Sequence, residues 1–500
     1  MFDYLLGGLS TAISLEVLPV LVFGVLGGVI LGALPGLTAT MGVAILLPFT
    51  FGMEPTAALV MLIGVYIGGI YGGSIAAILL RTPGTPASAA TVLDGHTMAV
   101  KGQAARALSI SAIASFIGGL ISTIVLIAIA PKLANFALKF NAPEYFALAL
   151  FGLTIIASVS SKNILKGLLA GTIGLLIATV GLDPISSVPR FTFGVMDLYS
   201  GINVIPVLIG LFALSEAMNQ LEKLRTEKQV KAAKFDHKLL SKADLKEMLP
   251  TAIKSGAMGT AIGSVPGAGA DISAFVCYNE AKRSSKNPEE FGKGSVRGLT
   301  SAEAGNNGVT GGSLVPLLTL GVPGDAVAAV LLGALIVQGL TPGPLLFAQN
   351  PEVVYGVFSS MLIANLVMLA IGLVGIRFFC RIIEVPKMIM IPIIIFLSVV
   401  GAYAINNSMF DVGIAIAFGL LGFVLGKMDI PSSPILLAII LGPMAETNLR
   451  KSLLMFDGSW SFLYERPIAL AFILMAVFSV YSTLRMKKKQ ALKVQQQAEQ

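Results

Sequence analysis

The sequence predicts an all-α polytopic membrane protein with about 10–12 transmembrane helices, arranged as two inverted repeats whose helices are broken at Pro-Gly. Composition, the length of the charge-free runs and a repeated pattern of Pro-Gly dipeptides carry this prediction. Of the 500 residues, 55% are hydrophobic and only 12% are charged, against about a quarter charged in soluble domains. Such a chain lacks the polar surface that a soluble fold requires.

The apolar residues form long blocks without any charge. A helix needs about 20 apolar residues to cross the roughly 30 Å hydrocarbon core of a bilayer. Because backbone polar groups in lipid must pair within the protein, continuous blocks predict helices, whereas a β-barrel would require alternation. The charge-free runs include 17–53, 55–80, 107–131, 326–351, 353–376, 388–410 and 467–484.

The formal net charge of +7 reflects cations in loops and in the tail. Residues 223–246 contain eight Lys or Arg, and the positive-inside rule places this segment and the basic tail in the cytoplasm. We interpret both as solvated faces that can attract anionic lipid, with a partner contact as the alternative. Cys277 and Cys380 lie in apolar sequence and are expected to be unpaired thiols.

The chain repeats itself. Gly-Ala-Leu-Pro-Gly at 32–36 recurs as Gly-Ser-Val-Pro-Gly at 263–267, and the Gly-Gly-Ser-to-Pro-Gly pattern that begins at 72 recurs from 311. Farther on, 182–187 resembles 428–433, and Glu216 and Glu446 end the two repeats. The predicted organisation is an N-terminal lead-in without signal-peptide features (1–16), repeat one (17–222), a basic cytoplasmic linker (223–253), repeat two (254–455), a final transmembrane helix (456–484) and a basic cytoplasmic tail (485–500).

Matching loops of the two repeats differ in charge. Lys101 and Arg106 follow the second Pro-Gly, whereas the corresponding residues 333–349 contain no cation. Conversely, 282–297 contains five cations and its counterpart 49–56 contains none. Loops on opposite sides of the membrane would explain this difference, which favours inverted repeats. A third pair of loops, near 132–139 and 377–387, is cationic in both repeats and does not support the inversion.

The four Pro-Gly pairs are expected to open helices inside the membrane. Proline removes a backbone donor and glycine accepts positive φ, so each pair frees N–H and C=O groups that only a protein-buried or wet site tolerates. Half-helix N-termini there can bind a carboxylate, while tight helix packing is the alternative explanation. The predicted substrate-binding residues are Pro35, Gly36, Thr38, Thr40, Gly73, Ser74, Pro83, Gly84, Pro266, Gly267, Asn306, Asn307, Ser313, Pro323 and Gly324.

Embedded acids form the second set of candidates, because intramembrane carboxylates are costly and usually functional. Asp271, Asp325 and Glu303 are predicted to couple transport to an ion, Na⁺ or H⁺, with no other cofactor or metal. A loop position or a helix N-cap is the alternative, and Asp325 after Pro-Gly suits a cap. Arg81 either pairs with an anionic substrate or extends from a helix end towards the membrane surface.

Enzyme signatures are missing from the sequence. It contains no phosphate-binding loop, no H-E-x-x-H and no G-x-S-x-G. His96 and His237 stand alone in short polar segments, without a second histidine at helical spacing. The sequence therefore predicts a protein that is not an enzyme.

Three stretches resemble a known family, the large membrane subunit of the tripartite tricarboxylate transporters, called TctA. They are GALPGLTATMGVAILLPF at 32–49, YGGSIAAILLRTPGTPASAATVLDG at 71–95 and GNNGVTGGSLVPLLTLGVPG at 305–324. The resemblance implies a permease of the bacterial inner membrane, driven by an ion gradient. It also implies two partners, a small four-helix membrane subunit and a periplasmic solute-binding protein that delivers a small carboxylate.

The primary expectation is thus an inverted-repeat secondary transporter for a carboxylate, with its site where the two pairs of breaks face each other. Two alternatives stay open at this point. One is a dicarboxylate permease that needs no binding protein, and the other is a membrane scaffold or anion channel without active transport.

Overall fold

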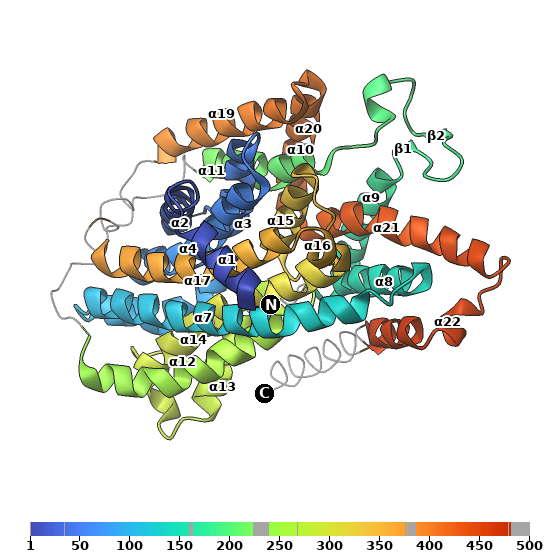
Figure 1. Ribbon diagram of the computed structural model, residues 1–500. Coiled ribbons are helices and arrows are strands. Elements are labelled where there is room, and N and C mark those ends of the chain that lie inside the picture. Colours follow the sequence, from blue (N-terminus) through green and yellow to red (C-terminus); the bar gives the residue numbers. More distant parts are fainter. Residues whose placement is uncertain are drawn as a thin grey trace, which may run out of the picture. The chain divides into compact units, whose positions relative to one another are not determined.

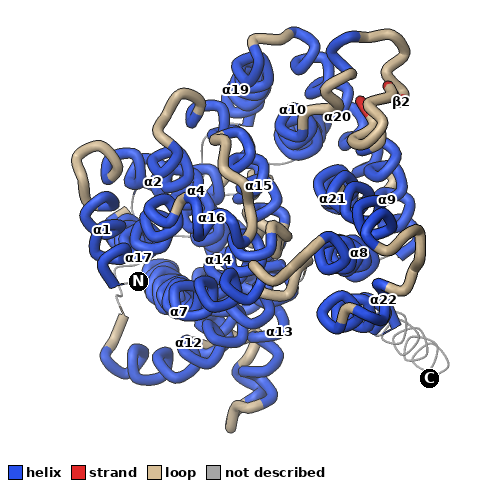
Figure 2. The backbone as a smooth tube through the Cα atoms, turned by 45° about the vertical axis from the view of Figure 1, so that its right-hand side comes forward, coloured by secondary structure: helices blue, strands red, loops and turns tan. Residues whose placement is uncertain are grey.

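The computed structural model describes residues 2–34, 36–159, 164–223, 240–267, 269–375, 378, 387–478 and 480–481. These residues are almost entirely helical (Figure 2), which confirms the predicted all-α fold. In the described part of the chain, the strands are β1 (Gly181–Leu182) and β2 (Pro189–Arg190), which pair antiparallel.

The helices belong to two compact units (Figure 1). The first unit comprises residues 1–137 and 208–423, and the second comprises 138–207 and 424–500. The main helices of the first are α1 (Phe2–Ala12), α2 (Leu18–Ala33), α3 (Ala39–Leu46), α4 (Pro55–Leu80), α5 (Ala89–Thr91), α6 (Thr97–Val100), α7 (Ala104–Ala137), α11 (Ser215–Lys223), α12 (Lys242–Gly263), α13 (Gly269–Arg283), α14 (Val296–Leu320), α15 (Ala326–Val337), α16 (Pro344–Gln349), α17 (Pro351–Val374), α19 (Lys387–Asn406) and most of α20 (Met409–Lys427).

Short 3₁₀ and π-helical turns connect these helices. They are η1 (Leu47–Thr50), η2 (Pro86–Ser88), η3 (Val92–His96), η5 (Ile209–Leu214) and η6 (Pro288–Glu290). The second unit contains α8 (Ala142–Val159), α9 (Ile164–Ala178), η4 (Met196–Leu198), α10 (Val204–Leu208), α21 (Ser433–Met455), α22 (Phe462–Glu465) and the helix Pro467–Phe478. The last residue of α10, Leu208, belongs to the first unit.

Within the described residues, six helices are long and apolar enough to cross a membrane. They are Pro55–Leu80, Ala104–Ala137, Val204–Glu222, Pro351–Val374, Met388–Asn406 and Met409–Lys427. Shorter apolar helices include Leu18–Ala33, Ala39–Thr50 and Ala326–Val337, each of which ends or begins at a Pro-Gly pair. The chain is therefore a multi-pass membrane protein in which breaks shorten several apolar helices.

The position of each break follows from proline and glycine acting together. Helices α2, α4, α12 and α14 end at Ala33, Leu80, Gly263 and Leu320, within three residues of a Pro-Gly pair. In contrast, prolines without a following glycine lie inside helices α7, α12, α14, α19 and α21. Neighbouring helices satisfy the group that a lone proline frees, whereas Pro-Gly lets the chain turn away.

The two repeats pack their helices in the same way. Helix α2 packs on α4 and α12 packs on α14 through glycines that bring the backbones into direct contact. A Cβ on Gly84 would clash with the carbonyl of Gly32 and the Cα of Gly73. A Cβ on Gly324 would likewise meet the carbonyl of Gly263 at 2.7 Å and the Cα of Ser313 at 2.6 Å. In packing, Gly73 therefore corresponds to Ser313 rather than to Gly312.

Two contacts between loops bear on the predicted inversion of the repeats. The Lys101 ammonium donates a 2.7 Å hydrogen bond to the carbonyl of Lys293, so the two cation-rich loops lie together. The Gln338 amide donates a 3.0 Å bond to the carbonyl of Thr50, which joins the two loops without cations. An inverted arrangement requires this pairing, and the inversion itself stays a prediction.

Two of the segments predicted outside the repeats contain helical residues. The lead-in contains α1, which packs on α17, with the rings of Tyr4 and Tyr355 stacked at 5.5 Å between centroids. Helix α12 begins at Lys242, capped by Ser241, inside the segment predicted as linker. The rest of the basic linker (224–239) and the basic tail lie outside the described residues, as do His237 and Cys380.

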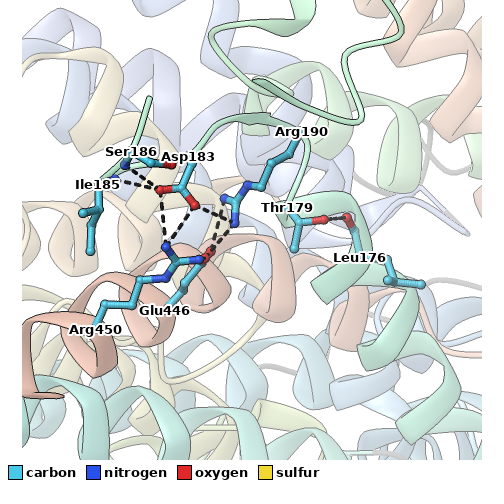
Figure 3. Close-up of polar contacts among 8 residues, drawn as sticks. All are labelled: Leu176, Thr179, Asp183, Ile185, Ser186, Arg190, Glu446 and Arg450. Atoms are coloured by element: carbon cyan, nitrogen blue, oxygen red, sulfur yellow. Dashed lines mark hydrogen bonds and ion pairs between the residues drawn. The ribbon is translucent and has the colours of Figure 1, made fainter. Parts of the chain in front are cut away.

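The second unit is held together by a network of four charged residues (Figure 3). Asp183 accepts hydrogen bonds from the backbone N–H groups of Ser186 (2.8 Å) and Ile185 (3.0 Å), and it pairs with Arg450 at 3.0 Å. Glu446 on α21 pairs with Arg450 at 2.6 Å and with Arg190 at 2.7 Å. These backbone hydrogen bonds, with the charge of Arg450, hold the pKa of Asp183 well below its usual range.

Candidate functional site

The first break separates α2 from α3. Gly36 has φ of +90°, a conformation that favours glycine, and Pro35 lies outside the described residues. The Thr38 hydroxyl caps α3 by accepting a 3.2 Å hydrogen bond from the N–H of Met41, and Thr40 is buried in the first turn. The predicted half-helix N-terminus is therefore present, with Thr38 serving as its cap.

The loop at Gly36 faces α11. A Cβ on Gly36 would lie 2.6 Å from Nε2 of Gln220 and 3.3 Å from Oε1 of Glu216. The amides of Asn219 and Gln220 approach the Glu216 carboxylate at 3.5 and 3.4 Å, and Oε1 of Gln220 is buried without a hydrogen-bond partner. Sequence reasoning did not identify Gln220, because its proximity to the break arises only in the fold.

The second break follows α4. Arg81 ends this helix in the left-handed conformation at φ +60°, where glycine is normally found, and its side chain is exposed. The N–H of Gly84 donates a 3.3 Å hydrogen bond to the carbonyl of Gly73, so the chain folds back on α4 after Pro83. The equivalent end of α14 carries Gly321 at φ +71°.

The third and fourth breaks contact each other directly. The N–H of Gly267, which has φ of +78°, donates a 2.7 Å hydrogen bond to the carbonyl of Gly324. Pro266 and Pro323 lie in these two turns. Asp325 then begins α15 as its N-cap, with Oδ1 accepting a 2.7 Å hydrogen bond from the N–H of Ala328.

A tyrosine links repeat one to the breaks of repeat two. The buried hydroxyl of Tyr66 on α4 donates to Oδ2 of Asp325 at 2.6 Å and lies 3.0 Å from the hydroxyl of Ser313 on α14. The sequence analysis missed Tyr66, although a hydroxyl in the middle of the charge-free run 55–80 was an available signal. Tyr66 brings two predicted residues, Ser313 and Asp325, into one cluster.

The breaks of repeat two carry two carboxylates. Asp271 lies in the first turn of α13, its side chain is exposed, and its charge acts on Asp325. The break residues of repeat one, 34–38 and 81–85, include the cation of Arg81 and no acid. The two pairs of breaks therefore differ in charge, although Glu216 lies near Gly36.

Two predicted asparagines lie on α14 and are fully buried. Neither the nitrogen nor the oxygen of the Asn306 side chain has a hydrogen-bond partner in the described structure. Asn307 donates to the hydroxyl of Ser115 at 2.8 Å, and its Oδ1 is unpartnered. Buried amides without partners cost about 1–3 kcal/mol per group, which favours a polar ligand at this position.

Glu303 and Ser74 belong to a second, fully buried cluster, separate from the cluster of Tyr66, Ser313 and Asp325. Glu303 accepts hydrogen bonds from Thr91, Ser111 and Ser115, and Ser74 lies 2.6 Å from Ser111. The structure thus separates Glu303 from the Asp271–Asp325 pair, although the sequence analysis placed all three acids in one class.

Asp94 was also missed. It is fully buried in η3, and Oδ1 accepts hydrogen bonds from the N–H groups of Gly292, Gly294 and Ser295 at 2.7–2.9 Å. Its Oδ2 accepts a 2.8 Å bond from the hydroxyl of Tyr278 on α13. Asp94 therefore ties the segment after the second break to the loop that begins α14.

The fold and the site define the class of the molecule as an all-α membrane protein with interrupted helices and buried polar groups at the interruptions. Sequence comparison gives the family. A profile described as "Tripartite tricarboxylate transporter TctA family" matches residues 18–437, so the chain belongs to the TctA family. This family is the large membrane subunit of tripartite transport systems, which work with a small membrane subunit and a periplasmic binding protein.

Two relatives come from Agrobacterium vitis. The "Uncharacterized 52.8 kDa protein in TAR-I ttuC' 3'region" is 38% identical over 461 residues, which cover 92% of each chain. The "Uncharacterized protein in TAR-II ttuC' 3'region" is 34% identical over 236 residues, which cover 46% of this chain and 98% of that protein. No solved structure matches.

Proposed function

We propose that this chain is the substrate-translocating subunit of its tripartite system and imports a small carboxylate by secondary transport, driven by a gradient of Na⁺ or H⁺. A periplasmic binding protein would deliver the carboxylate, and a small four-helix subunit would accompany the permease in the inner membrane, with the C-terminus in the cytoplasm. Family membership and the multi-pass fold support this proposal.

The observation that carries the proposal is the paired arrangement of the breaks. In repeat one, Gly84 packs against Gly32, and in repeat two Gly267 bonds to Gly324. Each pair lies inside a membrane protein, where freed backbone groups need partners, and Tyr66 of repeat one donates to Asp325 beside the fourth break. Backbone N–H groups that a break frees are suitable donors for a carboxylate.

In this proposal, the charges at the breaks decide which break binds the cation and which binds the carboxylate. Asp271 and Asp325 repel a carboxylate and attract a cation, so we assign them to the coupling ion. Arg81 and the uncharged residues Gly73 and Gly84 would contact the carboxylate at the second break, with Asn306 offering an unpaired amide. Bound cation and bound anion would then neutralise each other inside the membrane.

Uptake in proteoliposomes tests the proposal. The permease with its small subunit would be reconstituted, and uptake of a panel of radiolabelled di- and tricarboxylates would be measured with and without the purified binding protein. We expect accumulation above the external concentration that requires the binding protein and an inward Na⁺ or proton gradient. Accumulation without the binding protein would indicate a stand-alone permease. Equilibration without accumulation would indicate a channel, and no flux would indicate a scaffold.

A further inference from the structure

We propose that Glu303 carries a proton through the transport cycle and that its hydroxyl ring connects this proton to the second break. The inference extends the proposed function, since it adds a proton site apart from Asp271 and Asp325. We define the hydroxyl ring as the side chains of Ser74, Thr91, Ser111 and Ser115.

Both oxygens of the Glu303 carboxylate accept hydrogen bonds from hydroxyl groups. Oε1 of Glu303 accepts a hydrogen bond from the Thr91 hydroxyl, and Oε2 accepts from Ser111 at 3.2 Å and Ser115 at 3.0 Å. These donors come from α5 and α7, while Glu303 lies on α14. Two helices therefore place hydroxyls around one fully buried acid on a third helix.

The described residues provide no positive charge that pairs with Glu303. Among the described residues, no Lys, Arg or His forms an ion pair with Glu303. The titratable groups that face its surroundings are Tyr71 on α4, Cys277 on α13 against Gly305, and Asp94 in η3 against Gly298. None of these provides a positive charge, so a proton on the carboxyl group is the simplest means of neutralising it.

The hydroxyl ring can accommodate both the ionised and the protonated form of Glu303. A hydroxyl both donates and accepts hydrogen bonds, and its hydrogen can rotate without moving the oxygen. The hydroxyl ring can therefore donate to an ionised Glu303 and accept from a protonated one. We assign the site to H⁺ because rotation of the hydroxyl hydrogens accommodates a proton without displacing any of the oxygens.

The hydroxyl ring also reaches the second break. The Ser111 hydroxyl lies 2.6 Å from that of Ser74, which donates a 2.7 Å bond to the carbonyl of Tyr71 on α4. Ser74 directly follows Gly73, whose carbonyl accepts the N–H of Gly84. A change in the charge of Glu303 would therefore reorient hydrogen bonds at Ser74, the residue next to Gly73, whose carbonyl bonds to Gly84 in the second break.

Infrared spectroscopy of the reconstituted permease complex tests the proton directly and needs no substrate. We expect wild type to show the C=O stretching band of a buried carboxylic acid, with an amplitude that falls as pH rises. Glu303→Gln should remove this pH-dependent component. The matched control is Glu144→Gln, because Glu144 is also buried (2% exposed) but caps α8 outside the hydroxyl ring, and it should leave the component in place.

Three infrared results would overturn the proposal. The component could persist in Glu303→Gln, it could be lost in Glu144→Gln instead, or NaCl at constant pH could abolish it in wild type, which would assign the site to Na⁺. In the uptake assay, with citrate as the probe, Glu303→Gln should lose stimulation by an inward proton gradient but retain exchange of internal for external citrate. Loss of exchange as well would contradict a role in proton coupling. If wild type transports no carboxylate, the proposed function fails while the infrared result still decides the proton site.

Discussion

The hydroxyl of Tyr66 donates a 2.6 Å hydrogen bond to the carboxylate of Asp325, although 259 positions separate the two residues. Tyr66 lies in the middle of α4 in repeat one, and Asp325 caps α15 directly after the fourth break. With the cap occupying one carboxylate oxygen and Tyr66 the other, a break in repeat two depends on a side chain from repeat one. We therefore expect changes at either residue to affect both stability and transport.

Tyr66→Phe should lower the free energy of unfolding by about 1–3 kcal/mol, because it leaves a half-buried carboxylate oxygen without its donor. Thermal unfolding in detergent measures the effect. Tyr464→Phe is the control, since Tyr464 is 70% exposed. An unchanged unfolding temperature for Tyr66→Phe would mean that the bond does not stabilise the protein.

A comparison of the variants Gly36→Ala and Gly102→Ala distinguishes the effect of backbone strain from the effect of side-chain crowding at the first break. Both glycines have positive φ, +90° and +76°, so each substitution should cost roughly 1–2 kcal/mol of stability. Only Gly36 has a neighbour, Nε2 of Gln220 at 2.6 Å, whereas a Cβ on Gly102 meets nothing within 4 Å. Uptake per folded molecule should fall in Gly36→Ala alone, and equal uptake in both variants would remove the first break from the site.

Arg81→Gly should stabilise the protein. A non-glycine residue in the left-handed region costs of order 1–3 kcal/mol, and glycine at the C-cap removes this cost, as Gly321 does on α14. Differential scanning fluorimetry would show a raised unfolding temperature. A lowered one would mean that the Arg81 side chain makes stabilising contacts that outweigh the strain.

Asp183→Ala should accelerate hydrogen exchange at Ile185 and Ser186, whose N–H groups bond to the Asp183 carboxylate (Figure 3). The pKa of Asp183 is lowered in the folded protein, so its contribution to stability is complete above the unfolded pKa, about 3.9 for Asp. The contribution is lost as pH falls from there through the folded pKa. Protection in wild type that fades well above the unfolded pKa would contradict this assignment.

Inverted topology predicts where single cysteines can be labelled. Cysteines at Gln103 and Ser284 should react only from the cytoplasm, because the cation-rich loops lie together through Lys101 and Lys293. A cysteine at Gly339 should react only from the periplasm, beside the contact between Gln338 and Thr50. Reaction of positions 103 and 339 from the same side would exclude the inversion.

Local sequence features predicted much of the fold. Charge-free runs identified the helices, and Pro-Gly identified their ends at Ala33, Leu80, Gly263 and Leu320, because proline and glycine act on the backbone at their own positions. The alternative that Asp325 caps a helix was confirmed for the same reason, since capping depends only on the next three residues.

The composition of the site was less predictable. Tyr66, Gln220 and Asp94 contribute through partners more than 180 positions away, and no local pattern encodes such contacts. Grouping Glu303 with Asp271 was reasonable from sequence, since both are acids in apolar surroundings. Only the packing of α7 on α14 reveals that Glu303 has its own hydroxyl ring.

In the proposed mechanism, the second break binds the carboxylate while Asp271 and Asp325 bind the coupling cation. The most direct test measures, in proteoliposomes, the half-saturating concentrations of carboxylate and of cation for Arg81→Gly and Asp271→Asn, with Asp197→Asn, an exposed acid outside the breaks, as control. We expect a crossed pattern. Arg81→Gly should raise the half-saturating concentration of carboxylate and leave that of the cation, measured at saturating carboxylate, unchanged. Asp271→Asn should raise the half-saturating concentration of the cation and leave that of carboxylate, measured at saturating cation, unchanged. If both variants change the same requirement, or if neither differs from Asp197→Asn, the assignment of charge to the two pairs of breaks is wrong.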